Sequence, residues 1–451
     1  MPPPPMEPPR TTWADLPPEL LSCVADRLHA AAPYVAARAV CAAWRSALPP
    51  PSPSLLVADA HGSAFALSLP LRCAFLLSPL PNRSRCVGSG HGWLAVACEE
   101  DVSYQDPDLH CRNFVAGAGW RVVGGSRRER LRIVLLNPCT GERIALPQHA
   151  RLNPDSVSKI AFASIPRAGD FTVVAACGLG PLARTIAYIR TRVGGGGGAT
   201  WSFEEIPGGT VLADVVYHDG DGEEDGGDKV YCLTANCDVY VLHIRPRKNP
   251  VLEPLLADFA GGAVSYPAHV FAPTYAQLSG IITGAKNLVF CDGNLYQVWR
   301  NTTGGAFRFM SPEGGGDAGE WFQVSEDEVF VLRYYPARRP CWEAVGDLGG
   351  HSVFVAPASD AVAVRAEGVP GLKVDCVYWT SRVGDRRAMV FDMKARRSTP
   401  CLAPSTDTAG RPVCWYFFRR MAIGSNDDDG EILQPQQKCS RLSKNPSWMF
   451  L

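Results

Sequence analysis

Short apolar runs, separated by glycine, proline, asparagine and aspartate, follow one another from Leu55 to the end of this 451-residue chain. Runs of this length between turn residues are typical of β-strands, and long helical stripes are almost absent from this region. The expected strands are 63–69, 92–98, 131–136, 171–177, 183–190, 211–217, 229–233, 238–244, 287–291, 294–299, 328–335, 352–356, 374–380 and 388–393. Roughly 400 residues of short strands are too many for a single β-sandwich. Sheets arranged around a central axis leave only short, protected strand edges. We therefore expect a mainly β protein built as a β-propeller, with six or seven blades.

Turn chemistry between these runs supports the same architecture. Asn137-Pro138 and Thr140-Gly141 lie between two apolar runs, and Asp292-Gly293 lies between two others. Glycine takes a positive φ at no steric cost, which suits tight hairpin connections. The stretch Gly88-Ser89-Gly90-His91-Gly92 predicts another tight turn, which feeds a strand at Trp93. It is not a Gly-x-Ser-x-Gly nucleophile motif, because its serine is misplaced.

Residues 13–48 differ from the rest because their apolar residues recur at helical spacing. One helix is expected to begin near Asp15, with Pro17, Pro18 and Glu19 in its first turn, and a second is expected to begin at Pro33. The apolar stripes are Leu20, Leu21, Val24, Ala25 and Leu28, then Val35, Ala36, Ala39, Val40, Ala43, Trp44 and Ala47. So short a segment cannot bury this surface by itself. It implies either a partner protein or packing of the helical hairpin on its own domain.

Changes in amino-acid composition along the sequence divide the chain into four segments. We expect a disordered proline-rich leader at residues 1–10, a helical module at 11–48, a semi-rigid proline-rich linker at 49–54 and a propeller domain at 55–451. In a propeller the last segment often completes a blade that the first one begins. The apolar end Trp448-Met449-Phe450-Leu451 is therefore expected to be docked.

The helical segment resembles the F-box, a short module that docks on a Skp-type adaptor. The resemblance rests on Leu16-Pro17-x-Glu19-Leu20-Leu21, followed about twenty residues later by Val40-Cys41-x-x-Trp44-Arg45. The resemblance implies an adaptor-binding surface, and through the adaptor a link to a cullin. That surface would consist of Leu16, Pro17, Leu20, Leu21, Leu28, Val35, Val40, Cys41 and Trp44.

The remainder resembles the C-terminal part of a plant F-box family, the KIB-type β-propeller, long described as a domain of unknown function. The stretches that carry the resemblance are 88–94, 135–147, 346–355 and 371–379. Glycine- and acid-rich insertions depart from the family pattern, as does the charged run at 127–130.

Composition excludes several classes of protein. The 44 basic and 45 acidic residues nearly balance, so no nucleic-acid footprint is present. No apolar run reaches the roughly 20 residues of a membrane span. The sixteen cysteines are scattered singly with no Cys-x-x-Cys pair, which is typical of reduced thiols in a cytoplasmic or nuclear protein.

Catalytic and metal-binding patterns are weak. Five glycines at 194–198 lack the Gly-Lys-Ser/Thr ending of a phosphate-binding loop, and the acidic stretch 219–225 lacks the glycine and bidentate glutamate of a calcium loop. The nine histidines are dispersed. We expect no catalytic residue, no metal and no cofactor.

The two resemblances imply the substrate-recognition subunit of a Skp-cullin-F-box E3 ubiquitin ligase, a non-catalytic receptor whose propeller binds an unknown protein target. Two alternatives remain open. The propeller channel could carry a ligand site or an enzyme activity, in which case several Asp, Glu or His side chains should converge on the channel. The F-box could also serve a scaffold that acts outside the ligase.

Overall fold

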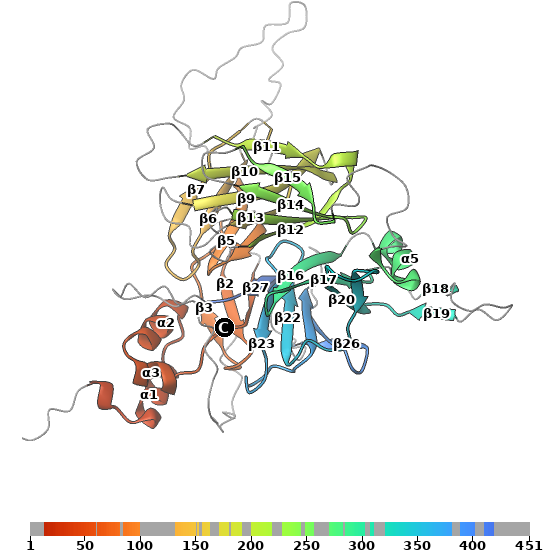
Figure 1. Ribbon diagram of the computed structural model, residues 1–451. Helices are drawn as coiled ribbons and strands as arrows, with labels where there is room; N and C mark the ends of the chain where they lie inside the picture. Colours follow the sequence, from red (N-terminus) through yellow and green to blue (C-terminus); the bar gives the residue numbers. More distant parts are fainter. Residues whose placement is uncertain are drawn as a thin grey trace, which may run out of the picture.

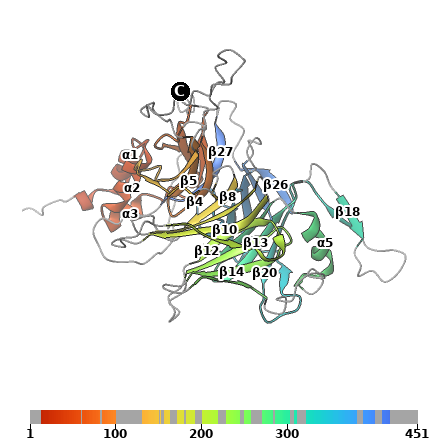
Figure 2. The same ribbon diagram turned by 90° about the horizontal axis from the view of Figure 1, so that it is seen from above.

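The computed structural model describes residues 13–59, 61–81, 84–99, 131–149, 151–152, 156–162, 171–179, 182–191, 200–218, 228–244, 249–256, 270–282, 285–302, 307–310, 321–380, 388–401 and 410–418. Within these ranges six β-sheets of four or five strands form the blades of a propeller, and a separate two-stranded hairpin extends from it. Three short helices lie at one side, while helix α5 (Pro273–Ile281) and the hairpin lie at the opposite side (Figures 1 and 2). The mainly β fold and the propeller are confirmed.

In blades 2 to 5 the strands follow one another in chain order from the innermost outward. Blade 1 begins instead with β27, and in blade 6 β23 lies inside β22, which pairs with β24 in parallel. From the inside outward, blade 1 holds β27 (Arg411–Tyr416), β1 (Ser54–Ala58), β2 (Ala64–Ser68) and β3 (Ala74–Leu76); blade 2 holds β4 (Arg85–Gly90), β5 (Trp93–Glu99), β6 (Leu131–Leu136) and β7 (Arg143–Ala145); blade 3 holds β8 (Val157–Phe162), β9 (Phe171–Leu179), β10 (Leu182–Thr191) and β11 (Ser202–Glu205). Blade 4 holds β12 (Leu212–His218), β13 (Asp228–Thr234), β14 (Val239–Ile244) and β15 (Val251–Pro254); blade 5 holds β16 (Lys286–Cys291), β17 (Asn294–Arg300), β20 (Val329–Tyr334) and β21 (Trp342–Ala344); blade 6 holds β23 (Val362–Arg365), β22 (His351–Val355), β24 (Cys376–Thr380), β25 (Ala388–Asp392) and β26 (Arg397–Pro400). The hairpin joins β18 (Phe307–Met310) to β19 (Trp321–Val324).

Alternate residues of one strand enter two different cores. On β8, Ile160 and Phe162 pack in the core between blades 2 and 3, whereas Ala161 packs in the core between blades 3 and 4. Successive side chains of a strand point to opposite faces, and both faces of this blade are covered by a neighbouring blade. This double burial explains why the strands appear in the sequence as continuous apolar runs and not as apolar–polar alternation.

The ring closes through β27, which comes from the C-terminal part of the chain and pairs with β1, with Trp415 opposite Leu55. On its other side β27 contacts β4, where the Ser89 hydroxyl donates to the Trp415 carbonyl at 3.4 Å. The Trp415 ring packs against Phe354 of blade 6, with 5.1 Å between ring centroids. The strand that completes blade 1 is therefore 411–416, and the expected docking of Trp448–Leu451 falls outside the described residues.

The helical segment differs in detail from the sequence-based expectation. It forms a 3-10 turn η1 (Trp13–Asp15), then α1 (Pro18–Ala25), α2 (Ala31–Ala39) and α3 (Ala42–Ala47). The N-cap position of α1 is Pro17, so the helix begins three residues after Asp15. The second pattern splits into two helices because Cys41 is fully extended, and its sulfur accepts a hydrogen bond from the Trp44 amide at 3.4 Å.

These helices pack directly on blade 1. The ring centroids of Tyr34 and Phe75 lie 4.9 Å apart, and the Tyr34 hydroxyl donates to the Pro49 carbonyl at 2.9 Å. The Leu76 amide donates to the His29 carbonyl at 2.8 Å, so the chain between α1 and α2 extends the outer edge of β3. Pro51 and Pro53 are buried. The proline-rich segment therefore takes part in the packing between the helices and blade 1.

The expected strands are present, and so are the turns near Asn137 and Asp292. The turn expected over residues 88–92 is confined to His91 and Gly92, because Gly88, Ser89 and Gly90 end strand β4, where Gly88 lies against the Ile160 carbonyl. Asn137 accepts backbone hydrogen bonds within its turn, and Gly141 has φ +77°. Asp292 and Gly293 have φ +47° and +69°, which join β16 to β17. Helix α5 was not expected from the sequence. Within the described ranges, no helix combines the length and apolar character needed to cross a membrane.

Candidate functional site

Large apolar side chains are exposed on the helical module, residues 13–48. Their exposed fractions are 76% for Trp13, 52% for Leu20, 42% for Val24 and 53% for Val40. Leu20 and Val24 lie one turn apart on α1, so they share a helix face. Exposed apolar side chains that gather on one module are typical of protein-binding surfaces.

The predicted adaptor-binding residues fall into three groups of exposure. Pro17, Leu20 and Val40 are exposed, and Leu21 and Val35 are buried. The half-buried residues are Leu16, Leu28, Cys41 and Trp44. Leu21 belongs to the core between the helices and blades 1 and 2, so in this conformation it holds the module on the propeller.

Sequence reasoning missed Trp13 and Val24 as surface residues. Val24 follows Leu20 by four residues, a spacing that already placed both on one helix face. Trp13 is held by α3, because the Trp44 indole nitrogen donates to the Trp13 carbonyl at 2.8 Å. Trp44 and Cys41 thus organise the module from within, whereas Trp13, Leu20, Val24 and Val40 present its apolar surface.

A second group of residues converges on the inner strands of the propeller. The Lys159 ammonium lies 2.6 Å from Asp214 Oδ1 and 3.4 Å from Asp360 Oδ1. Burial by itself lowers the pKa of Lys159, but the two carboxylates raise it overall. Burial raises the pKa of Asp360 to about 6, although Lys159 opposes this rise.

This buried cluster connects five blades. Asp214 Oδ2 accepts a hydrogen bond from the Leu288 amide of blade 5 at 2.8 Å, and the Asp360 amide of blade 6 donates to the Ser89 carbonyl of blade 2 at 3.1 Å. A Cβ at Gly90 would lie 2.8 Å from Asp360 Oδ2, so a larger residue there would require the Asp360 carboxylate to shift. Convergence of acidic side chains is what we expect if the propeller channel carries a ligand site or an enzyme activity. Here, however, the lysine and the two carboxylates are bound to one another.

Ser89 and His91, which are close in the sequence, do not form a nucleophile–base pair. Ser89 donates to the Trp415 carbonyl, and His91 takes φ +50° in the turn before Trp93. Within the described ranges no group of three or more His, Cys, Asp or Glu side chains could hold a metal ion.

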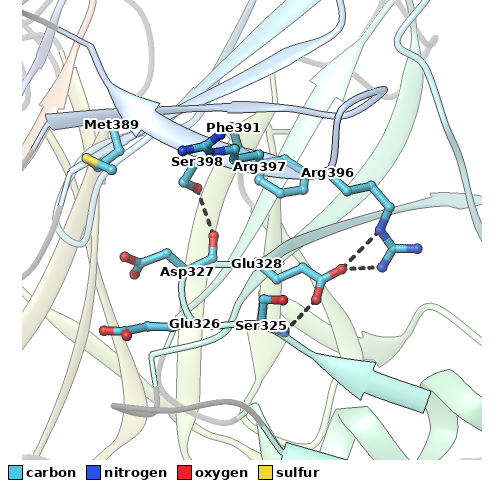
Figure 3. Close-up of a pocket in the computed structure, with 9 residues that line it drawn as sticks. All are labelled: Ser325, Glu326, Asp327, Glu328, Met389, Phe391, Arg396, Arg397 and Ser398. Atoms are coloured by element: carbon cyan, nitrogen blue, oxygen red, sulfur yellow. Dashed lines mark hydrogen bonds and ion pairs between the residues drawn. The ribbon is translucent and has the colours of Figure 1, made fainter. Parts of the chain in front are cut away.

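A cavity of about 300 Å³ lies between the turn that precedes β20 and the β25–β26 hairpin (Figure 3). Arg396 Nε donates to Glu328 Oε1 at 3.0 Å, and the Ser325 amide donates to Glu328 Oε2 at 2.8 Å. Figure 3 shows the carboxylates of Glu326 and Asp327 on the side away from this ion pair. The cavity is lined by polar side chains together with Met389 and Phe391, and both carboxylate oxygens of Glu328 accept hydrogen bonds.

Comparison with known proteins identifies the propeller. The model of the KIB1-4 beta-propeller family matches residues 65–398. Two solved structures, assigned as 6-phosphogluconolactonases from Bacteroides fragilis and Bacteroides uniformis, are similar to the chain at 10% and 12% identity, with TM-scores of 0.34 and 0.33. Each similarity covers 81% of this chain and 98% or 99% of the other. A search of curated proteins finds no match. The family match spans most of the chain, which therefore belongs to the KIB1-4 beta-propeller family.

Proposed function

We propose that this protein is the substrate-recognition subunit of a Skp-cullin-F-box E3 ubiquitin ligase. The helical module would dock on a Skp-type adaptor, and the propeller would hold a protein target. The observation that carries the proposal is the exposure of Leu20, Val24 and Val40 on a module whose sequence resembles the F-box. The β-propeller fold itself supports a role in protein interaction.

The exposed side chains suit a stable complex. Burial of each Leu or Val side chain contributes about 1.5–3 kcal/mol before ordering costs are subtracted. Because the opposite face of the module packs on blade 1 through Leu21 and Tyr34, the adaptor would be held in a fixed position relative to the propeller. A fixed position limits the conformational entropy that would be lost when adaptor and target bind together.

In this proposal the protein performs no bond chemistry. It acts by proximity, because a target held near the ubiquitin-charged enzyme reacts at a raised effective concentration. Ubiquitin transfer is carried out by partner proteins. The site of action would be the cytoplasm, the nucleus or both.

Co-purification with a plant Skp-type adaptor tests this function. We expect wild type to capture the adaptor and the Leu20→Asp, Val40→Asp double variant to lose at least nine tenths of the capture, because both charges would be placed in an apolar interface. Val251→Asp, Val374→Asp is the matched control, since both valines are exposed outside the helical module. It should capture the adaptor as wild type does.

Failure of well-folded wild type to capture the adaptor would contradict the proposal. Equal capture by the Leu20→Asp, Val40→Asp variant would contradict the proposed surface. A complex that contains the adaptor but recruits no cullin would instead favour a scaffold outside the ligase.

A further inference from the structure

Where β20 leads into β21 in blade 5, the guanidinium groups of Arg333 and Arg338 lie over the ring of Tyr335, and Arg339 follows Arg338 in the same turn. We name Arg333, Tyr335, Arg338 and Arg339 the Arg–Tyr cluster. Residues 336–339 are exposed, and the side chain of Arg338 is 56% exposed. Residues 333–343 contain these three arginines and a single acid, Glu343. The turn therefore carries an excess positive charge in a chain whose net charge is −1.

Aromatic rings hold two of the guanidinium groups. The Arg333 guanidinium carbon lies 5.0 Å from the Tyr335 ring centroid and 5.9 Å from that of Tyr296. The Arg338 guanidinium carbon lies 4.1 Å from the Tyr335 centroid. A cation over a tyrosine ring at these distances is stabilised by the ring's negative face. Tyr335 therefore organises two positive charges at once.

Hydrogen bonds fix the same groups. Arg333 Nη2 donates to Asn294 Oδ1 at 2.7 Å, and Arg338 Nη1 donates to Glu343 Oε2 at 2.8 Å. Arg339 Nη1 donates to the Arg338 carbonyl at 2.8 Å. The partner of Arg333 in this set is an uncharged amide, so its positive charge is not neutralised there. The side chains are ordered before any ligand arrives, which lowers the entropy cost of binding.

We propose that the Arg–Tyr cluster is a docking surface for an acidic segment of another protein. Charge complementarity selects the partner, because arginine forks bind carboxylates with short, charge-assisted hydrogen bonds. Arginine and tyrosine are also the residue types that dominate binding energy in protein interfaces. The inference rests on the proposed function only in taking this partner to be the target of the ligase.

Fluorescence anisotropy with the full chain and a labelled peptide of eight glutamates tests the surface. We expect the Arg338→Glu, Arg339→Glu double variant to bind the peptide at least tenfold more weakly than wild type. The matched control is Arg151→Glu, Arg365→Glu, which makes the same charge change at arginines that are 57% and 55% exposed and also lie near a glutamate. The control should bind within twofold of wild type.

Two further variants separate geometry from charge. Tyr335→Ala removes the shared ring but no charge, and we expect at least a threefold loss of peptide binding. Arg338→Lys, Arg339→Lys keeps the charge but not the planar forks, and we expect an intermediate loss. The arginine variants should keep the melting temperature of wild type, because Arg338 and Arg339 are exposed. Tyr335 is half-buried, so the peptide binding of Tyr335→Ala is compared with that of wild type at a temperature well below the melting point of both.

The proposal would be overturned if the control lost as much affinity as the Arg338→Glu, Arg339→Glu variant, since binding would then reflect overall charge alone. Tighter binding of a single-stranded oligonucleotide than of the glutamate peptide would overturn it as well, in favour of a nucleic-acid partner. Adaptor capture by the Arg338→Glu, Arg339→Glu variant is measured in parallel and should equal that of wild type. Failure of this docking surface is thereby distinguished from failure of the ligase function.

Discussion

Asp360 is the least compensated member of the cluster that Lys159, Asp214 and Asp360 form at the inner strands of the propeller. Asp214 accepts hydrogen bonds from Lys159 and from two backbone amides, those of Val215 and Leu288. Asp360 Oδ1 has only the Lys159 ammonium at 3.4 Å and no hydrogen bond. One lysine cannot fully neutralise the buried carboxylate of Asp214 together with that of Asp360, whose side chain is 16% exposed, so protonation of Asp360 relieves the excess negative charge.

This imbalance predicts a pH-dependent stability. Because the pKa of Asp360 rises from 3.8 to about 6 on folding, the native state binds more protons than the unfolded state between these values. The contribution of this group to the unfolding free energy therefore falls as pH rises from 4 to 6. We expect the unfolding free energy of Asp360→Asn, minus that of wild type, to increase by about 2–3 kcal/mol between pH 4 and pH 7.

Urea-induced unfolding at pH 4, 5, 6 and 7 measures this difference. Asp347→Asn, at an exposed aspartate, controls for the removal of one carboxylate from the chain. A difference between Asp360→Asn and wild type that stayed constant across this range would show that Asp360 has an ordinary pKa in the folded protein.

At the scale of elements, the sequence predicted strands better than helices. A strand such as β9 is buried on both faces, with Val173 in one core and Val174 in the next, so its apolar run is unmistakable. Helix α5 has only nine residues, and a tertiary contact fixes it, because the buried ammonium of Lys286 donates to the Ser279 carbonyl within it. No local pattern in the sequence encodes that contact.

The candidate site was predicted only in part for the same reason. Periodicity placed Leu20 and Leu21 in one apolar stripe, but it could not tell which of them faces the propeller. In the structure Leu21 is buried against the core of blades 1 and 2, and Leu20 is exposed. The helices and the propeller meet through Phe75 of β3, which packs between Tyr34 of α2 and Phe418.

We therefore expect Phe75→Ala to loosen the helical module selectively. The loss of a buried phenylalanine costs about 3–5 kcal/mol in the unfolding free energy, and amide hydrogen exchange in α1–α3 should accelerate more than exchange in blades 3–5. Phe162→Ala removes an equally buried ring from the core between blades 2 and 3 and is the control. If both variants raised exchange in the helices equally, the module would not depend on its packing against Phe75.

At the scale of the whole molecule, the sequence predicted a propeller in which the last segment completes a blade begun by the first, but it did not identify the closing strand, β27. Short strands with turn residues between them require a closed or covered sheet, and this argument reached the correct architecture. Which strand closes the ring depends on the pairing of residues far apart in the chain, such as Leu55 with Trp415. Hydrophobicity marked the last residues of the chain as well, so it could not select 411–416.

Because β27 closes the ring, its removal should destabilise the whole propeller. A chain that ends at Gly410 lacks β27, and it therefore exposes the edge of β1 and removes Trp415 from the core between blades 6 and 1. An open apolar edge pairs with other chains. We expect this truncated chain to form oligomers on size-exclusion chromatography and to unfold at a lower urea concentration than the full chain.

Addition of a peptide with residues 411–418 should partly restore the monomer, because its strand can pair with β1, whereas a scrambled peptide should not. A truncated chain that stayed monomeric, with an unchanged unfolding midpoint, would show that the ring holds together without its closing strand.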